Sequence, residues 1–268
     1  MIRDITIGQY YSVDSIVHRL DARVKIIGTL VYIISLFTFR SLIGYAVAVS
    51  FFFLALFLSK IPFLYTVKGL KPVFLLLVFT AFLNLFWTDG KVFLQLGFLS
   101  MTWEGLYKMV YISLRLILLV LGSSLMTLTT TPNQLTDGLE HLLGFLKVFR
   151  APVHEIAMMM SIALRFIPIL IEETNRIMDA QTARGADFVS GNVLQRVKNM
   201  LPLLIPLFVS AIHRANDLAL AMDARCYHGG DGRTKMYPLH YGKRDMAAYG
   251  CFVVYIMILA AVVRFSPI

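Results

Sequence analysis

The sequence is poor in charged residues and in cysteine, and these two shortages already exclude several classes of protein. Only 15% of its 268 residues are charged, whereas a soluble domain has about a quarter. The two cysteines, Cys226 and Cys251, stand far apart and without ligand spacing, so neither a disulfide framework nor a zinc site is indicated. Apolar residues make up 58% of the chain, and the mean hydropathy is +0.72. This composition is too apolar for an ordinary cytosolic enzyme or a disordered chain, and it suits a bilayer.

Acidic residues are missing from the predicted membrane spans, and the motifs of common enzymes are missing from the chain. Gly90-Lys91 and Gly242-Lys243 lack the upstream glycine of a phosphate-binding loop, so no ATP site is predicted. The six histidines show no close pair at metal-ligand spacing, and no nucleophile with a base is suggested. We therefore expect no catalytic residue, no metal and no cofactor on this chain. A self-contained secondary carrier remains the alternative, although the absence of intramembrane carboxylates counts against it.

Five apolar runs fit the hydrocarbon core of a bilayer, which needs about 20 helical residues. Arg40 divides the first long run into a short helix and a full one, with a tight turn between them. Arg115 lies within the fourth run, where it is expected to face the bundle or, preferably, to snorkel outward. Because the first run begins only at Ile26, after Arg3 and Asp4, no cleavable signal peptide is predicted. The predicted spans are residues 26–39, 41–59, 72–88, 109–136 and 246–263.

The basic residues predict the orientation. The chain carries 25 Lys and Arg against 16 Asp and Glu, a net charge of +9. Five crossings place the termini on opposite sides, and 20 basic residues then lie on the side of the N-terminus against 4 on the other. This excess favours a multi-pass protein of the bacterial cell (inner) membrane with a cytoplasmic N-terminus. The same topology explains the net charge without a nucleic-acid partner.

Residues 131–245 resemble neither a soluble domain nor simple spans. Thr131 and Pro132 are typical of a helix start, and an amphipathic stretch follows. Residues 152–184 begin almost wholly apolar and turn polar after Leu170. Residues 192–225 repeat this design, with an apolar part at 201–212 and an amphipathic part at 214–225, and both stretches contain prolines that would kink or break a helix. Such helices suit the inner membrane surface under covering partner proteins, and an interfacial amphipathic pair is the alternative. The predicted fold is an all-α membrane protein with about five transmembrane helices and a cytoplasmic part of three long or kinked helices.

An internal repeat ends the last two of these helices. Residues 180–185 (AQTARG) and 221–226 (AMDARC) share the pattern Ala-x-x-Ala-Arg-small residue. Helix capping would explain one copy, because a cation complements the last turn and glycine is favoured just beyond it. Two copies in matching contexts favour two similar docking sites on a twofold or pseudo-twofold partner. Small alanines let the backbone approach a groove, and an arginine fork can reach a carboxylate.

Three consecutive methionines, residues 158–160, lie in the apolar half of the first of these two helices. We expect them chiefly to fill a core. Methionine-rich faces also suit partners that must re-pack, so a contact surface is the second interpretation.

Three stretches resemble the transmembrane T component of energy-coupling factor (ECF) importers, an ATP-binding-cassette transporter class for vitamins and metals. The first is Gly8-x-Tyr10 followed by SxxHxLDxRxK at residues 15–25, where many members have Pro in the place of Ala22. The second is ALRFIP (residues 163–168) leading to AQTARG, and the third is RAND (residues 214–217) leading to AMDAR. The resemblance covers essentially the whole chain, and Cys226 departs from the usual glycine.

The resemblance implies a non-catalytic subunit with three protein partners in the lipid bilayer. Two cytoplasmic ABC ATPases, which use the ATP and Mg, would each receive one helix end, and a separate membrane subunit that binds the vitamin or metal would contact the apolar helix halves. ATP-driven closure of the ATPases would move the two helices and reorient that subunit. The implied domains are residues 1–130 (spans 1–4), 131–245 (coupling helices) and 246–268 (span 5). The implied ATPase-docking residues are Ala183, Arg184, Gly185, Ala224, Arg225 and Cys226, and the implied substrate-subunit contacts are Met158, Met159, Ile162, Leu201, Leu204, Leu207 and Phe208.

Overall fold

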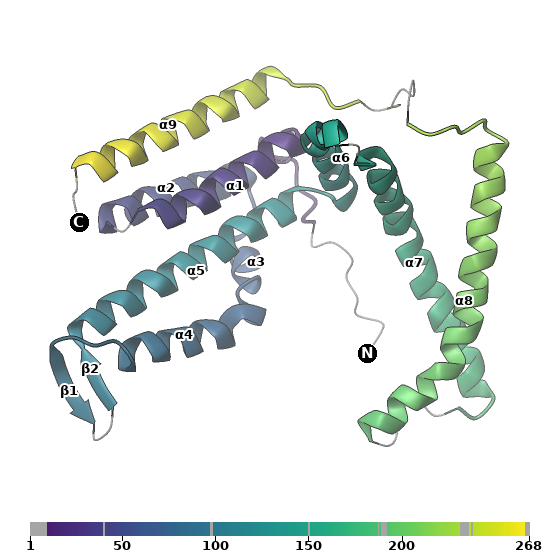
Figure 1. The fold of residues 1–268 in the computed structure, drawn as a ribbon, viewed down its shortest axis with the longest axis horizontal. Coiled ribbons are helices and arrows are strands. Elements are labelled where there is room, and N and C mark those ends of the chain that lie inside the picture. The colour runs from purple at the N-terminus through teal and green to yellow at the C-terminus, as the bar shows by residue number, and fades with distance from the viewer. Residues whose placement is uncertain are drawn as a thin grey trace. The chain divides into compact units, whose positions relative to one another are not determined.

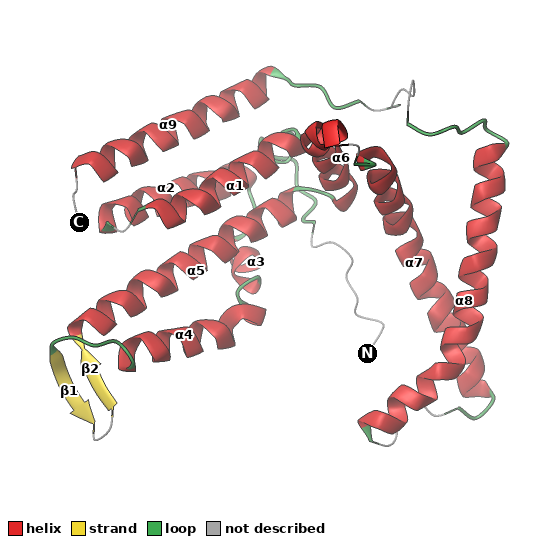
Figure 2. Ribbon diagram, viewed as in Figure 1, coloured by secondary structure: helices red, strands yellow, loops and turns green. Residues whose placement is uncertain are grey.

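The computed structural model describes residues 10–39, 41–96, 99–149, 151–186, 188, 192–230, 236 and 238–265. These residues are mainly helical, with one short β-hairpin (Figures 1 and 2). They belong to two compact units, of which one contains Glu140–Pro238 and the other contains Gly8–Leu139 with Leu239–Ile268.

The larger unit is a bundle of apolar helices. α1 packs against α5 and α9, α2 packs against α9 and α5, and α4 packs against α5. An antiparallel hairpin of β1 and β2 joins α4 to α5 (Figure 2). The elements are α1 (Ala22–Thr38), α2 (Leu42–Ser59), α3 (Phe63–Lys68), the 3₁₀ turn η2 (Lys71–Val73), α4 (Phe74–Phe86), β1 (Val92–Leu96), β2 (Leu99–Thr102), α5 (Trp103–Thr129), α6 (Pro132–Leu142) and α9 (Lys243–Phe265).

Short polar side chains begin several of these helices by accepting hydrogen bonds from free backbone N–H groups. Asp21 caps α1, Ser41 caps α2 and Thr102 caps α5. α6 begins with a reciprocal capping box. The N–H of Gln134 donates to the Thr131 hydroxyl at 3.3 Å, and the N–H of Thr131 donates to the Gln134 side chain at 3.2 Å.

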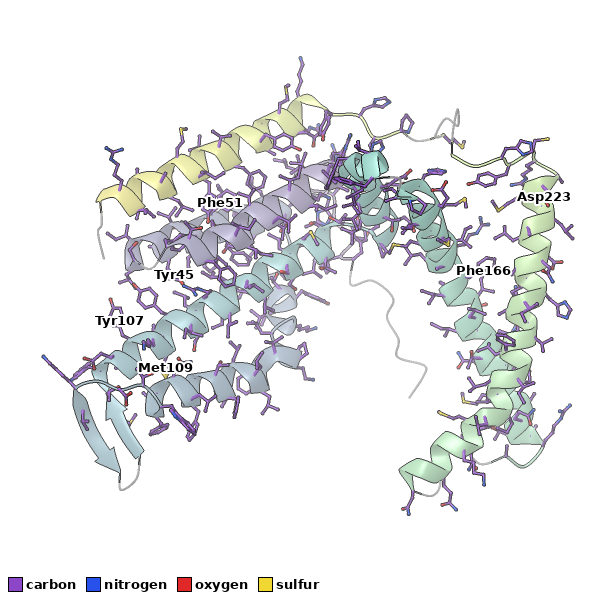
Figure 3. All side chains as sticks on the ribbon, in the orientation of Figure 1. Tyr45, Phe51, Tyr107, Met109, Phe166 and Asp223 are labelled. Carbon is purple, nitrogen blue, oxygen red and sulfur yellow. The ribbon has the colours of Figure 1, made fainter. Side chains whose placement is uncertain are left out.

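Aromatic and leucine side chains from α1, α2, α5 and α9 fill the centre of the bundle. Phe51 stacks on Tyr255 with ring centroids 4.3 Å apart (Figure 3). Polar atoms in this core form hydrogen bonds within it. The hydroxyl oxygens of Ser35 and Tyr255, for example, lie 2.8 Å apart. Such pairing avoids the cost of a bare polar group in an apolar surrounding. The buried cluster comprises Tyr32, Leu36, Phe39, Tyr45, Ala48, Phe52, Leu56, Ile61, Leu118, Leu121, Leu125, Leu128, Tyr255 and Leu259.

The predicted all-α membrane fold is confirmed, whereas the number of membrane-length helices differs from the five predicted. Four of the predicted spans overlap helices that are long and apolar enough to cross a membrane. The remaining one, the predicted short span, corresponds to α1, which has 17 residues and is not among these helices. The fourth predicted span extended too far, because α5 ends at Thr129 and α6 begins at Pro132. Arg40 lies outside the described residues. By length and composition the six candidates are Leu42–Ser59, Phe63–Phe86, Trp103–Thr129, Val153–Ala183, Lys198–Asp223 and Lys243–Arg264.

Arg115 faces the bundle, so the preferred expectation that it snorkels outward was wrong. Its Nε donates to the Tyr45 hydroxyl at 2.9 Å, and its guanidinium lies 5.3 Å from the centre of the Phe37 ring. A hydrogen bond and an aromatic face within reach make the inward position favourable for a cation in an apolar helix.

The second unit consists of the 3₁₀ segment η3 (Leu143–Phe149) and two helices of 31 residues each, α7 (Val153–Ala183) and α8 (Val193–Asp223). The predicted helices 152–184 and 192–225 are therefore confirmed to within two residues. Their prolines, Pro168, Pro202 and Pro206, lie inside continuous helices. They do not break them, although α8 changes direction along its length in Figure 1. Each proline removes one intrahelical hydrogen bond and so permits such a bend.

Two arginine-bearing helix ends as a candidate docking site

The end of α7 is a complete Schellman motif. The N–H of Ala186 donates to the Gln181 carbonyl at 3.0 Å, and the N–H of Gly185 donates to the Thr182 carbonyl at 2.9 Å. Gly185 has φ +90°, in the left-handed region where glycine carries no Cβ penalty. The chain therefore turns sharply away from the helix directly after Arg184.

The end of α8 repeats this hydrogen-bond pattern 41 residues later. The N–H of Tyr227 donates to the Met222 carbonyl at 3.1 Å, and the N–H of Cys226 donates to the Asp223 carbonyl at 2.9 Å. Cys226 takes the place of Gly185, with φ +54°. The left-handed conformation costs about 1–2 kcal/mol for a residue with a Cβ. The second copy thus keeps the backbone geometry of the first in spite of its cysteine.

All six predicted docking residues are exposed at these two ends: Ala183, Arg184, Gly185, Ala224, Arg225 and Cys226. Each arginine lies just beyond its helix and directly precedes the left-handed residue, with an exposed alanine before it. The structure thus gives both copies the same local presentation of a guanidinium beside a small, accessible backbone. Their assignment to ATPase docking remains a prediction.

α7 and α8 cross one another, and an ion pair joins them at the crossing. Arg214 Nη2 donates to Glu173 Oε2 at 3.2 Å. Figure 1 shows the two helices crossing. Apolar side chains around Phe166 of α7, labelled in Figure 3, and Ala211 of α8 line the same contact. Glu173 and Arg214 are 41 residues apart, the same offset that relates the two helix ends. Arg214 belongs to the RAND motif, but its pairing with Glu173 was not predicted from the sequence.

The predicted substrate-subunit contacts lie on accessible apolar faces of α7 and α8. Met159, Leu201, Leu204 and Phe208 are 53–67% exposed, and Met158, Ile162 and Leu207 are half-buried. Leu204, Leu207 and Phe208 line one shallow groove with Leu170, and Ile162 lies in the neighbouring one. Their contact with a partner stays a prediction.

The preferred expectation that the methionines fill a core was wrong for two of them. Met159 and Met160 are 57% and 47% exposed, whereas Met158 is half-buried. A polarizable, flexible side chain left on the surface in this way suits a partner that re-packs against it.

A polar network holds the end of the larger unit at which α1 and α9 begin and α5 ends. Asp21 binds the Arg23 guanidinium through both carboxylate oxygens, at 2.8 and 3.1 Å, and its N–H donates to Asp245 Oδ1 at 2.9 Å. Lys25 Nζ donates to the carbonyls of His18 and Thr129, at 3.1 and 2.8 Å. This network uses the SxxHxLDxRxK segment, whose structural role the sequence analysis missed. The spacing of Asp21 and Arg23 was a local signal, but the partners on α5 and α9 are more than 100 residues away.

His18 belongs to the same network in its neutral form. Its Nε2 is 3.0 Å from the Tyr11 carbonyl oxygen, which can only accept, so Nε2 carries the proton. Nδ1, 2.7 Å from the Ser15 hydroxyl, then accepts from it. Burial lowers the pKa of His18 from its ordinary value of 6.5.

The described residues contain no cluster of metal-ligating side chains. Within the ranges that the structure describes, no three His, Cys, Asp or Glu side chains are grouped so that they could hold a metal ion. Both cysteines are exposed free thiols.

The comparisons with known proteins find relatives over nearly the whole length of the chain. Residues 14–236 match a family profile described as CbiQ, cobalt transport protein. The chain is 51% identical over 260 residues, 96% of both chains, to the energy-coupling factor transporter transmembrane protein EcfT of Clostridium kluyveri. Proteins of the same name from Acidaminococcus fermentans and Bacillus subtilis are 48% and 45% identical over 266 residues, 99% of each chain.

The fold and these matches define a multi-pass membrane transport protein. The chain belongs to the CbiQ/EcfT family, the transmembrane components of energy-coupling factor transporters.

Proposed function

We propose that this chain is the non-catalytic coupling subunit of an importer for a vitamin or a metal ion. It transmits the motion of two cytoplasmic ATPases to a separate membrane subunit that binds the substrate. The observation that carries the proposal is the duplicated helix end, with the same hydrogen bonds and an exposed arginine in both copies. A single capped helix would need no partner to explain it, but two matched ends fit two copies of one kind of groove.

Each arginine serves as an electrostatic anchor in this scheme. Arg184 and Arg225 pair with an acidic residue of one ATPase each, and Ala183 and Ala224 allow the backbone to approach closely. ATP and Mg act in the ATPases, and this chain binds no cofactor. The N-terminus lies in the cytoplasm, on the side of most basic loops.

The crossing of α7 and α8 converts the movement of their ends into a change of the surface that the substrate subunit contacts. Closure of the ATPases moves the two anchored ends relative to one another. The exposed apolar residues on the other halves of the helices then change their relative position. This works only if the closed ATPase pair favours one arrangement of the helices over the other.

The test is the double variant Arg184→Glu/Arg225→Glu. We expect it to insert into the membrane normally and to lose both co-purifying ATPases and ATP-driven uptake. Each single variant should be milder because the other anchor remains. Arg165→Glu on α7 and Lys198→Glu on α8 are matched controls: both side chains are exposed, and they lie on the same helices about 28 Å or more from the ends.

Assembly and uptake by the double variant would show that the docking assignment is wrong. Equal losses in the control variants would show that the effect is not specific to the helix ends. The secondary-carrier alternative is tested by placing the isolated chain in liposomes, where uptake without any ATPase would replace the proposal.

A further inference from the structure

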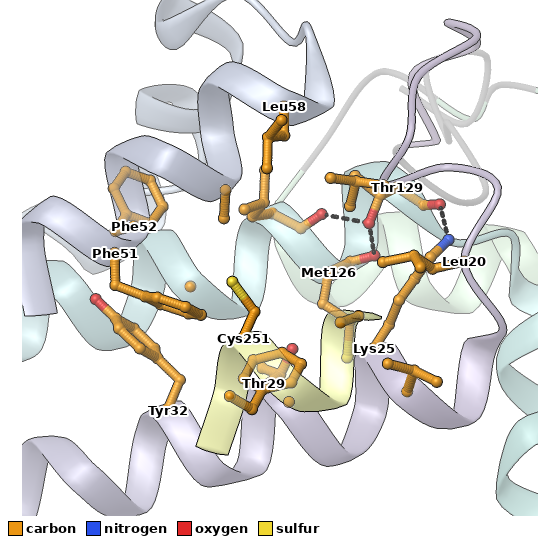
Figure 4. Close-up of a pocket in the computed structure, with 18 of the residues that line it drawn as sticks. Leu20, Lys25, Thr29, Tyr32, Phe51, Phe52, Leu58, Met126, Thr129 and Cys251 are labelled. Carbon is orange, nitrogen blue, oxygen red and sulfur yellow. Dashed lines mark hydrogen bonds between the residues drawn. The ribbon is translucent and has the colours of Figure 1, made fainter. Parts of the chain in front are cut away.

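The larger unit contains an apolar cavity of about 150 Å³ between α1, α2, α5 and α9 (Figure 4). Phe51, Phe52 and Met126 are among its walls, and Lys25 closes one end with its ammonium bonded to the Thr129 carbonyl (Figure 4). Cavities of about this size with aliphatic and aromatic walls stay dry and bind hydrocarbon. The cavity therefore suits a segment of an acyl chain.

The wall of the cavity reaches the exposed side of α2. Leu54 and Leu58 of α2 belong to its wall and are 48% and 36% exposed. Phe57, next to Leu58, is one of the most exposed aromatic side chains described, at 83%. Because α2 is a candidate membrane span, these side chains face the lipid or a partner, and hydrocarbon can enter beside them.

A cationic cleft of about 560 Å³ adjoins the cavity, and Leu58 lines both. Arg19, Lys60 and Arg244 contribute three positive charges to the cleft, and Asp14 contributes one negative charge. Arg19 forms an exposed ion pair with Asp14. The hydrogen bond from Arg19 holds the pKa of Asp14 below its usual range, and the charges of Lys60 and Arg244 act in the same direction. With three cations against one carboxylate, the cleft lining keeps a net positive charge.

Two of the three cations, Lys60 and Arg244, stand at the ends of two candidate spans. Lys60 directly follows the span Leu42–Ser59, and Arg244 is the second residue of the span Lys243–Arg264. This is the depth at which lipid phosphates lie, and basic pockets between transmembrane helices at this level bind anionic headgroups.

We propose that the cleft and the cavity form a binding site for one anionic phospholipid. Lys60 and Arg244 bind its phosphate, and one acyl chain passes Leu58 into the cavity between α1, α2, α5 and α9. An acidic peptide could satisfy the cations, but it would leave the adjoining dry cavity unused. The site is independent of the docking function of α7 and α8, since all of its residues belong to the other unit.

The experiment is native mass spectrometry of the purified full chain, with its co-purifying partners, during titration with defined lipids. The probes are dioleoyl-phosphatidylglycerol, dioleoyl-phosphatidylcholine, oleate and glycerol phosphate. We expect one phosphatidylglycerol to bind at least about tenfold more tightly than phosphatidylcholine, which corresponds to about 1.4 kcal/mol. Oleate has an acyl chain without a phosphate, and glycerol phosphate has a phosphate without an acyl chain. Each should therefore bind more weakly than the whole lipid.

Two variants separate the two parts of the site. Lys60→Gln/Arg244→Gln should abolish the preference for phosphatidylglycerol, while Lys71→Gln/Lys243→Gln makes the same charge change outside the cleft lining and should keep it. Ala55→Leu fills the cavity and should weaken phosphatidylglycerol binding, while Ala46→Leu adds the same side chain to an exposed position of α2. An unchanged thermal unfolding midpoint without added lipid shows that each variant is folded.

Equal binding of both phospholipids, or binding unaffected by the cleft and cavity variants, would overturn the proposal. Tighter binding of glycerol phosphate than of the lipid would also overturn it, because the site would then be for a free phosphate. So would loss of a protein partner from the Lys60→Gln/Arg244→Gln variant with lipid binding intact, because the cations would then serve a protein contact.

Discussion

Two Asp–Arg pairs close together in the sequence differ sharply in their surroundings. The side chains of Asp21 and Arg23 are 3% and 11% exposed, whereas those of Asp14 and Arg19 are 66% and 54% exposed. Removing one partner of a buried pair leaves an uncompensated charge, while an exposed pair is screened by water. The sequence pattern gives no hint of this difference.

Asp21→Asn is therefore expected to reduce the free energy of unfolding by about 3 kcal/mol. Asp14→Asn, the same change in the exposed pair, should leave stability nearly unchanged. Denaturant unfolding of both variants in detergent micelles measures the contrast. Similar losses in the two variants would mean that the network at Asp21 does not hold the bundle end together.

The partly buried His18 side chain is expected to make the stability of the fold depend on pH. Burial lowers its pKa in the folded state below 6.5, while the unfolded chain keeps the ordinary value. Below pH 6.5 the unfolded state therefore binds more protons, and stability falls as the pH drops towards the folded-state pKa. Above pH 6.5 the contribution is fully present.

The unfolding midpoint should thus decrease from pH 7 to pH 5, and His18→Gln should decrease less steeply over this interval. Both proteins are compared by thermal unfolding at each pH, so that contributions from carboxylates cancel in the difference. Parallel profiles for the two proteins would contradict the role given to His18.

At the scale of helices, the sequence was sufficient to predict an element where the residues of that element alone determine its bounds. Apolar runs, polar helix ends and Pro132 placed most helices within a few residues. The turn at Cys226 could not be derived, because cysteine does not favour the left-handed region. The hairpin of β1 and β2 was not predicted. Arg115 was misplaced because its partner Tyr45 lies on another helix.

The Glu173–Arg214 pair makes a prediction about how α7 and α8 act together. Both side chains are about a third exposed, so the pair contributes up to about 1 kcal/mol, or about fivefold in an equilibrium between two helix arrangements. In the reconstituted complex, Glu173→Arg should therefore reduce ATP-driven uptake by about fivefold without loss of the ATPases. The swapped double variant Glu173→Arg/Arg214→Glu should recover much of the uptake.

Glu172→Arg is the matched control, since Glu172 is the exposed neighbour of Glu173. Recovery in the swapped variant together with normal uptake by the control assigns the effect to the pair. If Glu172→Arg lowers uptake as much as Glu173→Arg, the charge of the helix rather than the crossing is responsible.

At the scale of the whole molecule, the sequence predicted the membrane fold, the family and the two helix ends. It could do so because hydropathy and an internal repeat are visible in one chain. The network of His18, Asp21 and Lys25 and the cavity beside Leu58 depend on contacts between distant segments. Periodicity and spacing do not show such contacts.

The central claim is that the ends of α7 and α8 dock two ATPases. Photo-cross-linking of the intact, transport-competent complex tests it most directly, with a photoreactive amino acid at Ala183 or Ala224 and, as a control, at exposed Ala46 of α2. Mass spectrometry then identifies the captured protein. We predict that positions 183 and 224 each capture a subunit with a nucleotide-binding loop, and that position 46 does not. Capture of only the substrate-binding membrane subunit at positions 183 and 224, or no capture in an active complex, would contradict the account.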